Sequence, residues 1–277
     1  MPELPELEVL KRGLAKTVVG RRIVKVTVNK KECLNVSPDK YKQMVQGARI
    51  VGARRKGKMA LLDLDNGNTL LIHLSLGGRV VLADPGEYQP NEVQIDYELD
   101  DGSHLLAAKL MLGNVHVLPT DKLKQDSRLA KMGRDALDDL PSADELAQML
   151  AGKRAAIKAF LMDQTELAGI GNMYANEILF AARLDPRTEA RALSRADVEK
   201  LHQAIQDVLK QAIADGGASE GPFTDVHGKP GRAHERAQVM WRGGQECPEC
   251  GGAIKEIRQA NRASYFCPKC QKKKRAR

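Results

Sequence analysis

Four cysteines near the C-terminus have the spacing of a metal site. They form two C-x-x-C pairs with sixteen residues between them: Cys247, Cys250, Cys267 and Cys270. Four thiolates at this spacing favour a tetrahedral structural zinc ion with no coordination position open to a substrate. We therefore expect one structural Zn²⁺, a hairpin held by the metal between the pairs, and no organic cofactor. The fifth cysteine, Cys33, is expected to be a buried, inert thiol.

The first residues, MPELPE, place a proline directly after the initiator methionine. Removal of Met1 would leave Pro2 as a free secondary amine with the Glu3 carboxylate beside it. A plainer interpretation, an unstructured start that contains a proline, stays open on these residues alone.

Two further segments have the composition of anion-binding sites. Gly169 and Gly171 make a tight turn before a predicted helix that starts near Asn172, and such a turn offers backbone N–H groups and the positive end of a helix dipole. Lys58 follows Gly57 at the mouth of a predicted strand, where a lysine can reach a phosphate. Spacing alone fits an ordinary surface lysine at this second position.

The chain of 277 residues has a net charge of +8 and a pI of about 9.2. Basic surface favours a polyanionic partner, because binding releases counterions from phosphates. Aromatic residues make up 4%, which argues against a single-strand binder built on several stacking platforms. No apolar run approaches the ~20 residues of a membrane helix, and charges interrupt the first segment. We expect no signal peptide, no membrane association and a cytoplasmic location.

The spacing of the apolar residues predicts a β-rich first part and a helical second part. Leucines at helical spacing predict a helix over residues 5–19, after which the period changes to two. Two hairpin turn signals follow in this part: Asn66-Gly67 and Asp101-Gly102. Helices are predicted later, over residues 142–150, 155–163, 173–183 and 194–214, and a mobile loop over residues 218–236.

Four motifs occur together in one order along the chain: MPELPE, RRKGK, DQTELAGIGNMYANEILFAARLDP, and the cysteine module with RASYFCPKCQ. Through them the whole chain resembles the Fpg/Nei family of DNA glycosylases, and Leu4 indicates its formamidopyrimidine-DNA glycosylase (Fpg) branch. The resemblance implies an α+β multidomain fold in three parts: an N-terminal helix and β-sandwich (1–125), a linker, helix–two-turns–helix domain and lesion-capping loop (126–236), and a β-hairpin zinc finger (237–277).

The same resemblance implies base-excision repair of damaged double-stranded DNA by a monomeric glycosylase with AP lyase activity, associated with the nucleoid through DNA binding. Pro2 would attack C1′ of the damaged nucleotide, and the resulting iminium would allow β- and then δ-elimination. Glu3 would protonate the sugar ring oxygen, Glu6 would support it, and Lys58 would contact phosphate in the catalytic centre. DNA contacts, some of them to the phosphates around a flipped nucleotide, are implied at His73, Lys158, Asn172 and Arg262.

The chain departs from its relatives in the loops that enter the duplex. Family members insert a methionine, an arginine and an aromatic residue, and the corresponding positions read Leu76, Leu110 and Leu112. The loop at 218–225 lacks the arginine–threonine–tyrosine pattern expected for capping 8-oxoguanine. Leucines can wedge a base step apart but cannot hydrogen-bond a base. We expect a lyase for oxidised purines (8-oxoguanine, formamidopyrimidines), abasic sites or unstacked and single-stranded DNA, with altered specificity and no preference for the opposite base.

Two other functions are compatible with parts of the sequence. A catalytically weak or inactive paralogue that binds damaged DNA would keep the scaffold, and a zinc-ribbon RNA-binding protein would explain the charge and the cysteines. Pro2, Glu3 and Lys58 are all present, which favours the enzyme over the first alternative. The second alternative, a zinc-ribbon RNA-binding protein, does not account for the N-terminal motif.

Overall fold

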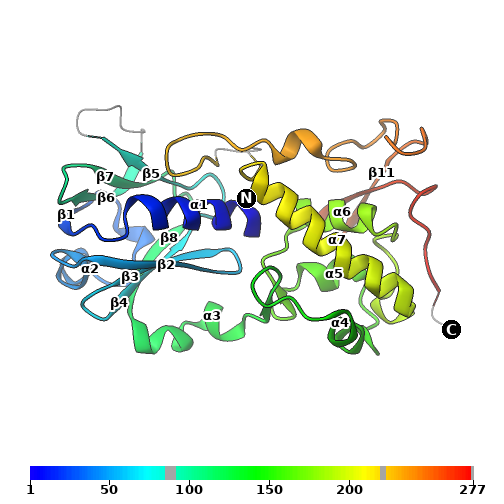
Figure 1. Cartoon of the computed structure of the whole chain (residues 1–277), viewed down its shortest axis with the longest axis horizontal. Helices are drawn as coiled ribbons and strands as arrows, with labels where there is room; N and C mark the ends of the chain where they lie inside the picture. The colour runs from blue at the N-terminus through cyan, green and yellow to red at the C-terminus, as the bar shows by residue number, and fades with distance from the viewer. Residues whose placement is uncertain (85–91, 219–222, 276–277) are drawn as a thin grey trace. The chain divides into compact units, whose positions relative to one another are not determined.

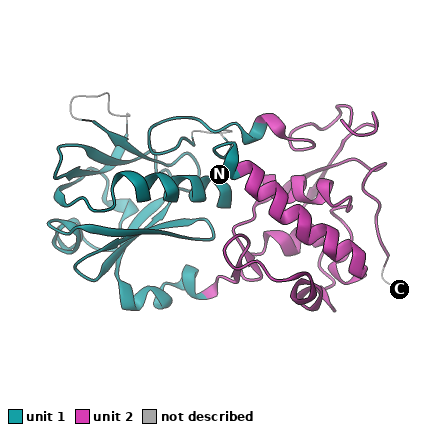
Figure 2. Ribbon diagram, viewed as in Figure 1, with its two compact units in different colours: residues 1–130, 213–234 teal, residues 131–212, 235–277 magenta. Residues whose placement is uncertain are grey.

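The computed structural model describes residues 1–84, 92–218 and 223–275. The chain divides by its internal contacts into two compact units, coloured in Figure 2: Met1–Ala130 with Ile213–His234, and Lys131–Ala212 with Glu235–Arg277. The cysteine module therefore belongs to the same unit as the helices. The division of the sequence at residues 125 and 236 stays a prediction.

Unit 1 is a β-sandwich of two four-stranded antiparallel sheets, which confirms the predicted fold class (Figure 1). One sheet has the order β1-β6-β7-β5, with β1 (Ile23–Val28), β6 (Val93–Leu99), β7 (His104–Ala108) and β5 (Arg79–Ala83). The other has the order β2-β3-β4-β8, with β2 (Ile50–Lys56), β3 (Met59–Leu64), β4 (Asn68–His73) and β8 (Asn114–Pro119). The glycines of the two predicted hairpin signals, Gly67 and Gly102, both have positive φ, as such turns require.

Helix α1 (Leu4–Thr17) begins the unit and packs against β2 and β3. Its leucines Leu7, Leu10 and Leu14 recur at helical spacing and all enter the sandwich core. The short helices of this part are η1 (Lys31–Cys33), α2 (Pro38–Val45), η2 (Thr120–Gln125) and α3 (Ser127–Lys131). Cys33 is buried, as expected, and burial raises the pKa of its thiol.

Unit 2 contains helices, as predicted, and the hairpin of the cysteine module. Its longer helices are α4 (Ala143–Leu150), α5 (Ile157–Met162), α6 (Asn172–Ala181) and α7 (Arg195–Ala214), the last ending at the junction with unit 1. Its short elements are β9 (Arg134–Asp135), β10 (Leu167–Ala168), η3 (Ala190–Ala192) and η4 (Ala233–Arg236), which begins in unit 1. The hairpin consists of β11 (Lys255–Gln259) and β12 (Arg262–Phe266).

Sequence rules account for where the helices of unit 2 begin. Ser142 caps α4 in a capping box: its Oγ accepts from the Glu145 N–H at 3.2 Å, and its own N–H donates to Glu145 Oε2 at 2.7 Å. Ser194 precedes α7 in a similar way, because its hydroxyl and N–H both donate to Asp197.

Within the described residues, no helix has the length and apolar character needed to span a membrane.

Candidate active site and nucleic-acid interface

The N-terminus runs directly into helix α1, so a regular element fixes the first residues. Pro2 and Glu3 are buried, whereas Met1 is 53% exposed. The Glu3 N–H donates to Oε2 of the buried Glu6 at 2.7 Å, across the first turn of the helix. An amine at position 2 would therefore be held on a rigid support with a carboxyl group beside it.

Glu6 has a second backbone partner far away in the sequence. Its Oε1 accepts from the Ala218 N–H at 2.7 Å. Gly217 has a φ of +78°, and a Cβ there would lie 3.0 Å from the Glu6 side chain, so only glycine allows this approach. The supporting role expected of Glu6 thus has a concrete form: one buried carboxylate holds the N-terminal segment and the chain that leads into residues 219–222. Those four residues of the expected lesion-capping loop lie outside the described residues.

Lys58 lies at the tip of the β2–β3 hairpin, in a two-residue turn between the paired Lys56 and Met59. Its neighbour Gly57 has a φ of +53°. The buried Arg55 donates from Nη1 to the Gly57 carbonyl at 3.1 Å and thereby fixes the turn that carries Lys58. The lysine is half-buried on a paired hairpin, and its contact with a phosphate stays a prediction.

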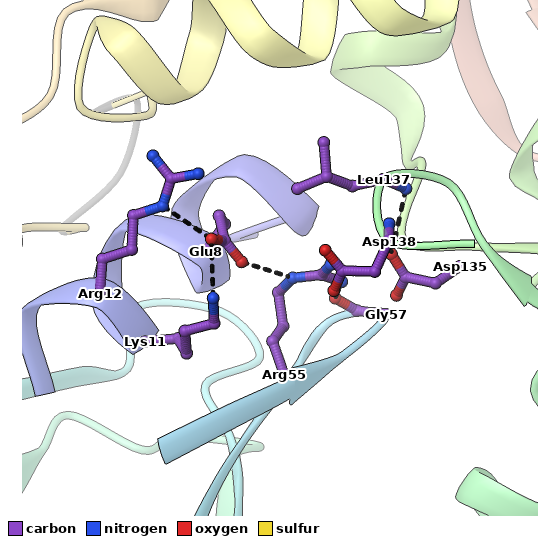
Figure 3. A network of polar contacts seen from close by, with 8 residues as sticks. All are labelled: Glu8, Lys11, Arg12, Arg55, Gly57, Asp135, Leu137 and Asp138. Atoms are coloured by element: carbon purple, nitrogen blue, oxygen red, sulfur yellow. Dashed lines mark hydrogen bonds and ion pairs between the residues drawn. The ribbon is translucent and has the colours of Figure 1, made fainter. Parts of the chain in front are cut away.

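Arg55 is itself held by Glu8 of helix α1 (Figure 3). Its Nε donates to Glu8 Oε2 at 3.2 Å, and Glu8 Oε1 also accepts from Lys11 at 2.9 Å and from Arg12 at 2.7 Å. Burial acts to raise the pKa of Glu8, but the hydrogen bonds from Lys11, Arg12 and Arg55 outweigh it and lower the pKa. Glu8 is therefore an anion at neutral pH that joins the helix after Pro2 to the hairpin before Lys58.

His73 is placed at the end of β4, near both Lys58 and Arg128. Burial lowers the pKa of His73, and the charges of Arg128 and Lys58 lower it further, so the imidazole is neutral at pH 7. Arg128 donates to Asn114 Oδ1 at 2.8 Å and to Nδ1 of His116 at 2.9 Å. A neutral His73 can donate one hydrogen bond to an anion, and its expected DNA contact stays a prediction.

Two loops expose apolar side chains at one end of the sandwich. Leu76 is 52% exposed, Met111 73% and Leu112 72%, and we call these three side chains the apolar tip. The loops are packed against each other, because a Cβ on Gly113 would lie 2.6 Å from the His73 carbonyl oxygen and 2.8 Å from that of Leu74. The exposed positions of Leu76 and Leu112 agree with the expectation that they enter a duplex, which stays a prediction.

Leu110, in contrast to Leu76 and Leu112, is buried. It is 2% exposed and belongs to the sandwich core, and its N–H donates to Gln94 Oε1 at 3.0 Å. The Met111 N–H donates to the Lys109 carbonyl at 2.8 Å, which turns the chain so that Leu110 points inward and Met111 outward. Insertion of Leu110 would empty part of the core. The residue presented beside Leu112 is therefore Met111, in place of the Leu110 expected from the sequence.

In unit 2 the turn before α6 is built as its sequence predicts. Gln164 braces it, since its Oε1 accepts from the Gly169 N–H and its Nε2 donates to the Ile170 carbonyl, each at 2.9 Å. Asn172 is the first residue of α6, and its Oδ1 is buried without a hydrogen-bond partner among the described residues. A phosphate there would accept from the Asn172 Nδ2 and from backbone N–H groups of the helix start, and this contact stays a prediction.

Arg262 is exposed at the start of β12, next to the hairpin turn formed by Ala260 and Asn261. Both turn residues have positive φ, +44° and +61°, as a two-residue type I′ turn requires. Lys158 of α5 lies below this strand and is 2% exposed. Its Nζ donates to the Ala263 carbonyl and to Ser264 Oγ, each at 2.7 Å.

These contacts place Lys158 away from the surface position that is expected of a residue that contacts DNA. Its ammonium group is buried and bound to the strand that carries Arg262. Both side chains also line one pocket of about 430 Å³ between α5 and the hairpin tip. Direct contact with DNA stays a prediction, and the observed contacts bind Lys158 to the strand that carries Arg262.

Substitution Lys158→Met is expected to weaken binding of damaged duplex DNA about tenfold, because it keeps the side-chain stem but leaves two buried acceptors without a donor. Arg262→Ala should weaken binding and flatten its salt dependence. If Lys158 acts through Arg262, the double variant should lose less affinity for DNA than the product of the two single-variant losses. Fluorescence anisotropy over a salt series measures the DNA affinity of the two single variants and of the double variant.

The exposed Lys200 of α7 supplies the matched control, because Lys200→Met removes the same charge from the same unit. Zinc content should stay unchanged in all four variants. Fully multiplicative losses for Lys158→Met and Arg262→Ala would show that Lys158 contacts DNA independently.

The four predicted zinc ligands converge in unit 2. The sulfur atoms of Cys247, Cys250, Cys267 and Cys270 all lie within 4.8 Å of one another. Cys247 and Cys270 are 3.8 Å apart and Cys250 and Cys267 are 3.5 Å apart. Zinc–thiolate bonds of ~2.3 Å in a tetrahedron place the sulfurs about 3.8 Å apart, so the site fits Zn²⁺. The predicted four-cysteine zinc site is confirmed.

Sequence reasoning did not single out three residues that the structure places beside predicted site residues: Glu8, Arg55 and Met111. The spacing of Glu8 with Lys11 and Arg12 on one helix face could have indicated the first. Arg55 lies in the RRKGK motif, but nothing local distinguishes the buried arginine from its exposed neighbour Arg54. Met111 lies in a run of apolar residues that has no periodicity to show which side chain faces outward.

Comparisons with known proteins match this arrangement along the whole chain. Three family models match in order: the formamidopyrimidine-DNA glycosylase N-terminal domain over residues 1–109, the formamidopyrimidine-DNA glycosylase H2TH domain over residues 132–222, and the zinc finger found in FPG and IleRS over residues 244–273. The formamidopyrimidine-DNA glycosylase of Chloroflexus aurantiacus is 38% identical over 273 residues, which cover 98% of each chain. That of Desulfitobacterium hafniense is 34% identical and covers 98% of this chain and 100% of its own.

Solved structures agree with these matches. A complex between Lactococcus lactis Fpg and DNA with an abasic site has a TM-score of 0.89 at 28% identity, covering 98% of this chain and 100% of that chain. The sandwich, the helical unit and the zinc hairpin together define a DNA glycosylase with lyase activity. More narrowly, the chain belongs to the formamidopyrimidine-DNA glycosylase family, as its motifs indicate.

Proposed function

We propose that this protein excises oxidised purines from double-stranded DNA and cleaves the strand at abasic sites, with Pro2 as nucleophile. The observation that carries the proposal is the buried Pro2–Glu3 pair at the start of α1, held through Glu6 to the Ala218 N–H. Relatives named formamidopyrimidine-DNA glycosylase and the Lactococcus lactis complexes with Fapy-dG and abasic-site DNA support the substrate class.

The chemistry needs only an amine and proton transfers. The Pro2 nitrogen donates its lone pair to C1′, and the glycosidic bond breaks with its electrons going to the departing base, which takes up the proton that the Pro2 amine loses. Glu3 protonates the ring oxygen as the sugar opens, which leaves an iminium between Pro2 and C1′. Loss of a C2′ proton then expels the 3′ phosphate, and a second elimination expels the 5′ phosphate. No organic cofactor enters this scheme.

Each unit carries side chains suited to contact with phosphates. In unit 1 Lys58 is fixed by the Arg55–Glu8 network, and in unit 2 Asn172 and Arg262 lie at a helix N-terminus and a hairpin tip. Phosphate contacts position a duplex without reading its sequence. We further propose that the protein acts as a monomer in the cytoplasm, associated with the nucleoid through DNA binding.

Incubation with damaged duplexes and borohydride tests the proposal. The protein with Met1 removed is mixed with duplexes that carry an abasic site, 8-oxoguanine or an oxidised pyrimidine, and reduction of the iminium should leave a covalent protein–DNA complex. Glu3→Gln should slow base excision more than it slows nicking at a preformed abasic site, because the abasic sugar needs no base expelled. A protein that binds these duplexes without any trapped complex would be the inactive damage-binding paralogue instead.

A further inference from the structure

Two histidines of unit 1 are neighbours on one face of the β4–β8 pair. The register pairs His73 of β4 with Asn114 of β8, and two positions further along it pairs Leu71 with His116. Directly paired residues point to the same face of a sheet, so His73 and His116 share a face as diagonal neighbours, about 7–8 Å apart. Ile72, which lies between Leu71 and His73, belongs to the sandwich core. The two imidazoles are therefore on the face turned away from the core.

Arg128 follows β8 in the chain and contacts this face. Its Nη1 donates to Asn114 Oδ1 at 2.8 Å, and its Nη2 donates to Nδ1 of His116 at 2.9 Å. The Asp126 carboxylate holds the same guanidinium group, since Nε donates to its Oδ1 at 3.2 Å and Nη2 to its Oδ2 at 3.1 Å. Three side chains thus fix the position of the Arg128 charge within the free protein.

The bond from Arg128 decides the state of His116. A guanidinium group stays protonated and can only donate, so Nδ1 of His116 must accept, and the proton of the neutral ring lies on Nε2. Protonation of Nδ1 would break this bond and bring two cations together. Burial lowers the pKa of His116 and the charge of Arg128 lowers it further, whereas Asp126 acts in the opposite direction.

Positive charge reaches His73 from two elements. Burial lowers its pKa, and Arg128 together with Lys58 at the tip of the β2–β3 hairpin lowers it further. Burial acts to raise the pKa of Asp126, but the hydrogen bonds from Arg128 outweigh it, so this carboxylate is an anion at neutral pH. Arg128 is the charge that acts on both rings, directly on His116 and through space on His73.

We propose that Arg128 is a positioning residue for DNA binding, which fixes the tautomer of His116 and keeps both imidazoles uncharged, so that His73 meets a phosphate as a neutral donor between about pH 6 and pH 8. This inference rests on the proposed function, in which Lys58 and His73 contact DNA. An ordinary histidine, with a pKa near ~6.5, would gain and lose a cation across this range. Arg128 thereby makes the grip of unit 1 on DNA insensitive to pH.

Binding of a duplex with a chemically reduced abasic site tests the inference, measured by anisotropy over a salt series at about pH 6 and about pH 8. Arg128→Gln removes the charge and keeps an amide donor. On acidification its affinity should rise about threefold more than that of the unmodified protein, because a protonated His73 adds a charged phosphate contact. Its salt slope should steepen by about one at the lower pH and equal that of the unmodified protein at the higher pH.

Two further variants locate this response. Arg128→Gln combined with His73→Gln should respond to pH as His73→Gln alone does. Arg54→Gln is the matched control, because Arg54 also forms a forked pair with a carboxylate in unit 1, that of Asp63. It should bind DNA with the pH dependence of the unmodified protein.

Titration of the imidazole signals by NMR reads the two rings directly in the free protein. The chain has six histidines, and His73→Gln and His116→Gln assign the two signals. Both rings should titrate below pH ~6.5 in the unmodified protein and closer to that value in Arg128→Gln. The nitrogen shifts of His116 should show the proton on Nε2. A titration of His73 at or above pH ~6.5 in the unmodified protein would overturn the inference without any variant.

The outcomes separate this inference from the proposed function. If no trapped complex forms on any substrate, the proposed function fails, and the binding series and ring titrations still decide the role of Arg128. A flatter salt slope for Arg128→Gln at the higher pH would show that Arg128 itself contacts a phosphate. That result, a pH response no larger than in the unmodified protein, or an enlarged response that persists without His73 would overturn the inference and leave the Pro2 chemistry intact.

Discussion

A protein whose Pro2 amine is blocked is expected to form no borohydride-trapped complex with abasic DNA. Retained Met1 or an N-terminal tag converts the secondary amine to an amide, whose nitrogen lone pair cannot form an iminium. Pro2→Gly leaves a primary amine and should reduce trapping at least a hundredfold, or about 2.7 kcal/mol in the barrier. Gel separation of the trapped complex over a time course measures the rate.

Pro5→Ala is the matched control for this experiment. Pro5 is also buried in the first turn of α1, but its nitrogen is part of the chain, so its loss should leave trapping in place. Binding to a reduced abasic site should be similar for the blocked and native proteins, which separates chemistry from affinity. Full trapping with a blocked terminus would assign the nucleophile to another amine, with Lys58 the first candidate.

The parts of the site that could be predicted from the sequence are those whose causes are local. Cysteine spacing defines a zinc site because four ligands need only two short turns and a hairpin to meet. The turn before α6 follows from Gly169 and Gly171, and α1 follows from leucines at helical spacing. In each case the residues that determine the geometry are neighbours in the chain.

Contacts between distant segments could not be predicted. The bond between Glu6 and the Ala218 N–H joins residues 212 positions apart, and Lys158 reaches Ser264 across 106 positions. A lysine in a basic chain is expected at the surface, and only the tertiary structure shows that the Lys158 ammonium group is buried against β12. The DNA contact predicted for Lys158 stays a prediction, and its partners on β12 add the hypothesis that it positions Arg262.

The loop at residues 109–113 shows a different limit of prediction from sequence. Leu110, Met111 and Leu112 are similar in hydrophobicity, so no pattern decides which of them faces the core. The left-handed Lys109 and the tight turn around Leu110 settle it, and they depend on packing against the loop at residues 74–78. A comparison of motifs by sequence alone therefore could not show that Leu110 is buried while Met111 is exposed beside Leu112.

Cys250→Ser is expected to lose zinc and, with it, at least tenfold in affinity for damaged DNA. Structural zinc sites contribute on the order of 10 kcal/mol or more to the folded state of small modules, so three thiolates should not keep the hairpin in place. The hairpin is fastened to the helices of its own unit by the Tyr265 N–H to Asn176 Oδ1 at 3.1 Å. The Gln271 Nε2 adds a bond to the Leu184 carbonyl at 2.8 Å.

Loss of the metal should therefore detach the strand that carries Arg262 while α4 to α7 keep their own buried residues. Zinc is measured by a colorimetric chelator after unfolding, DNA affinity by anisotropy, and helix content by circular dichroism. Cys33→Ser is the matched control, because Cys33 is a buried thiol in unit 1 and its loss should leave one zinc per chain. One equivalent of zinc and undiminished affinity in Cys250→Ser would contradict a site built on four thiolates, since the Cys250 sulfur is one of the four that meet there.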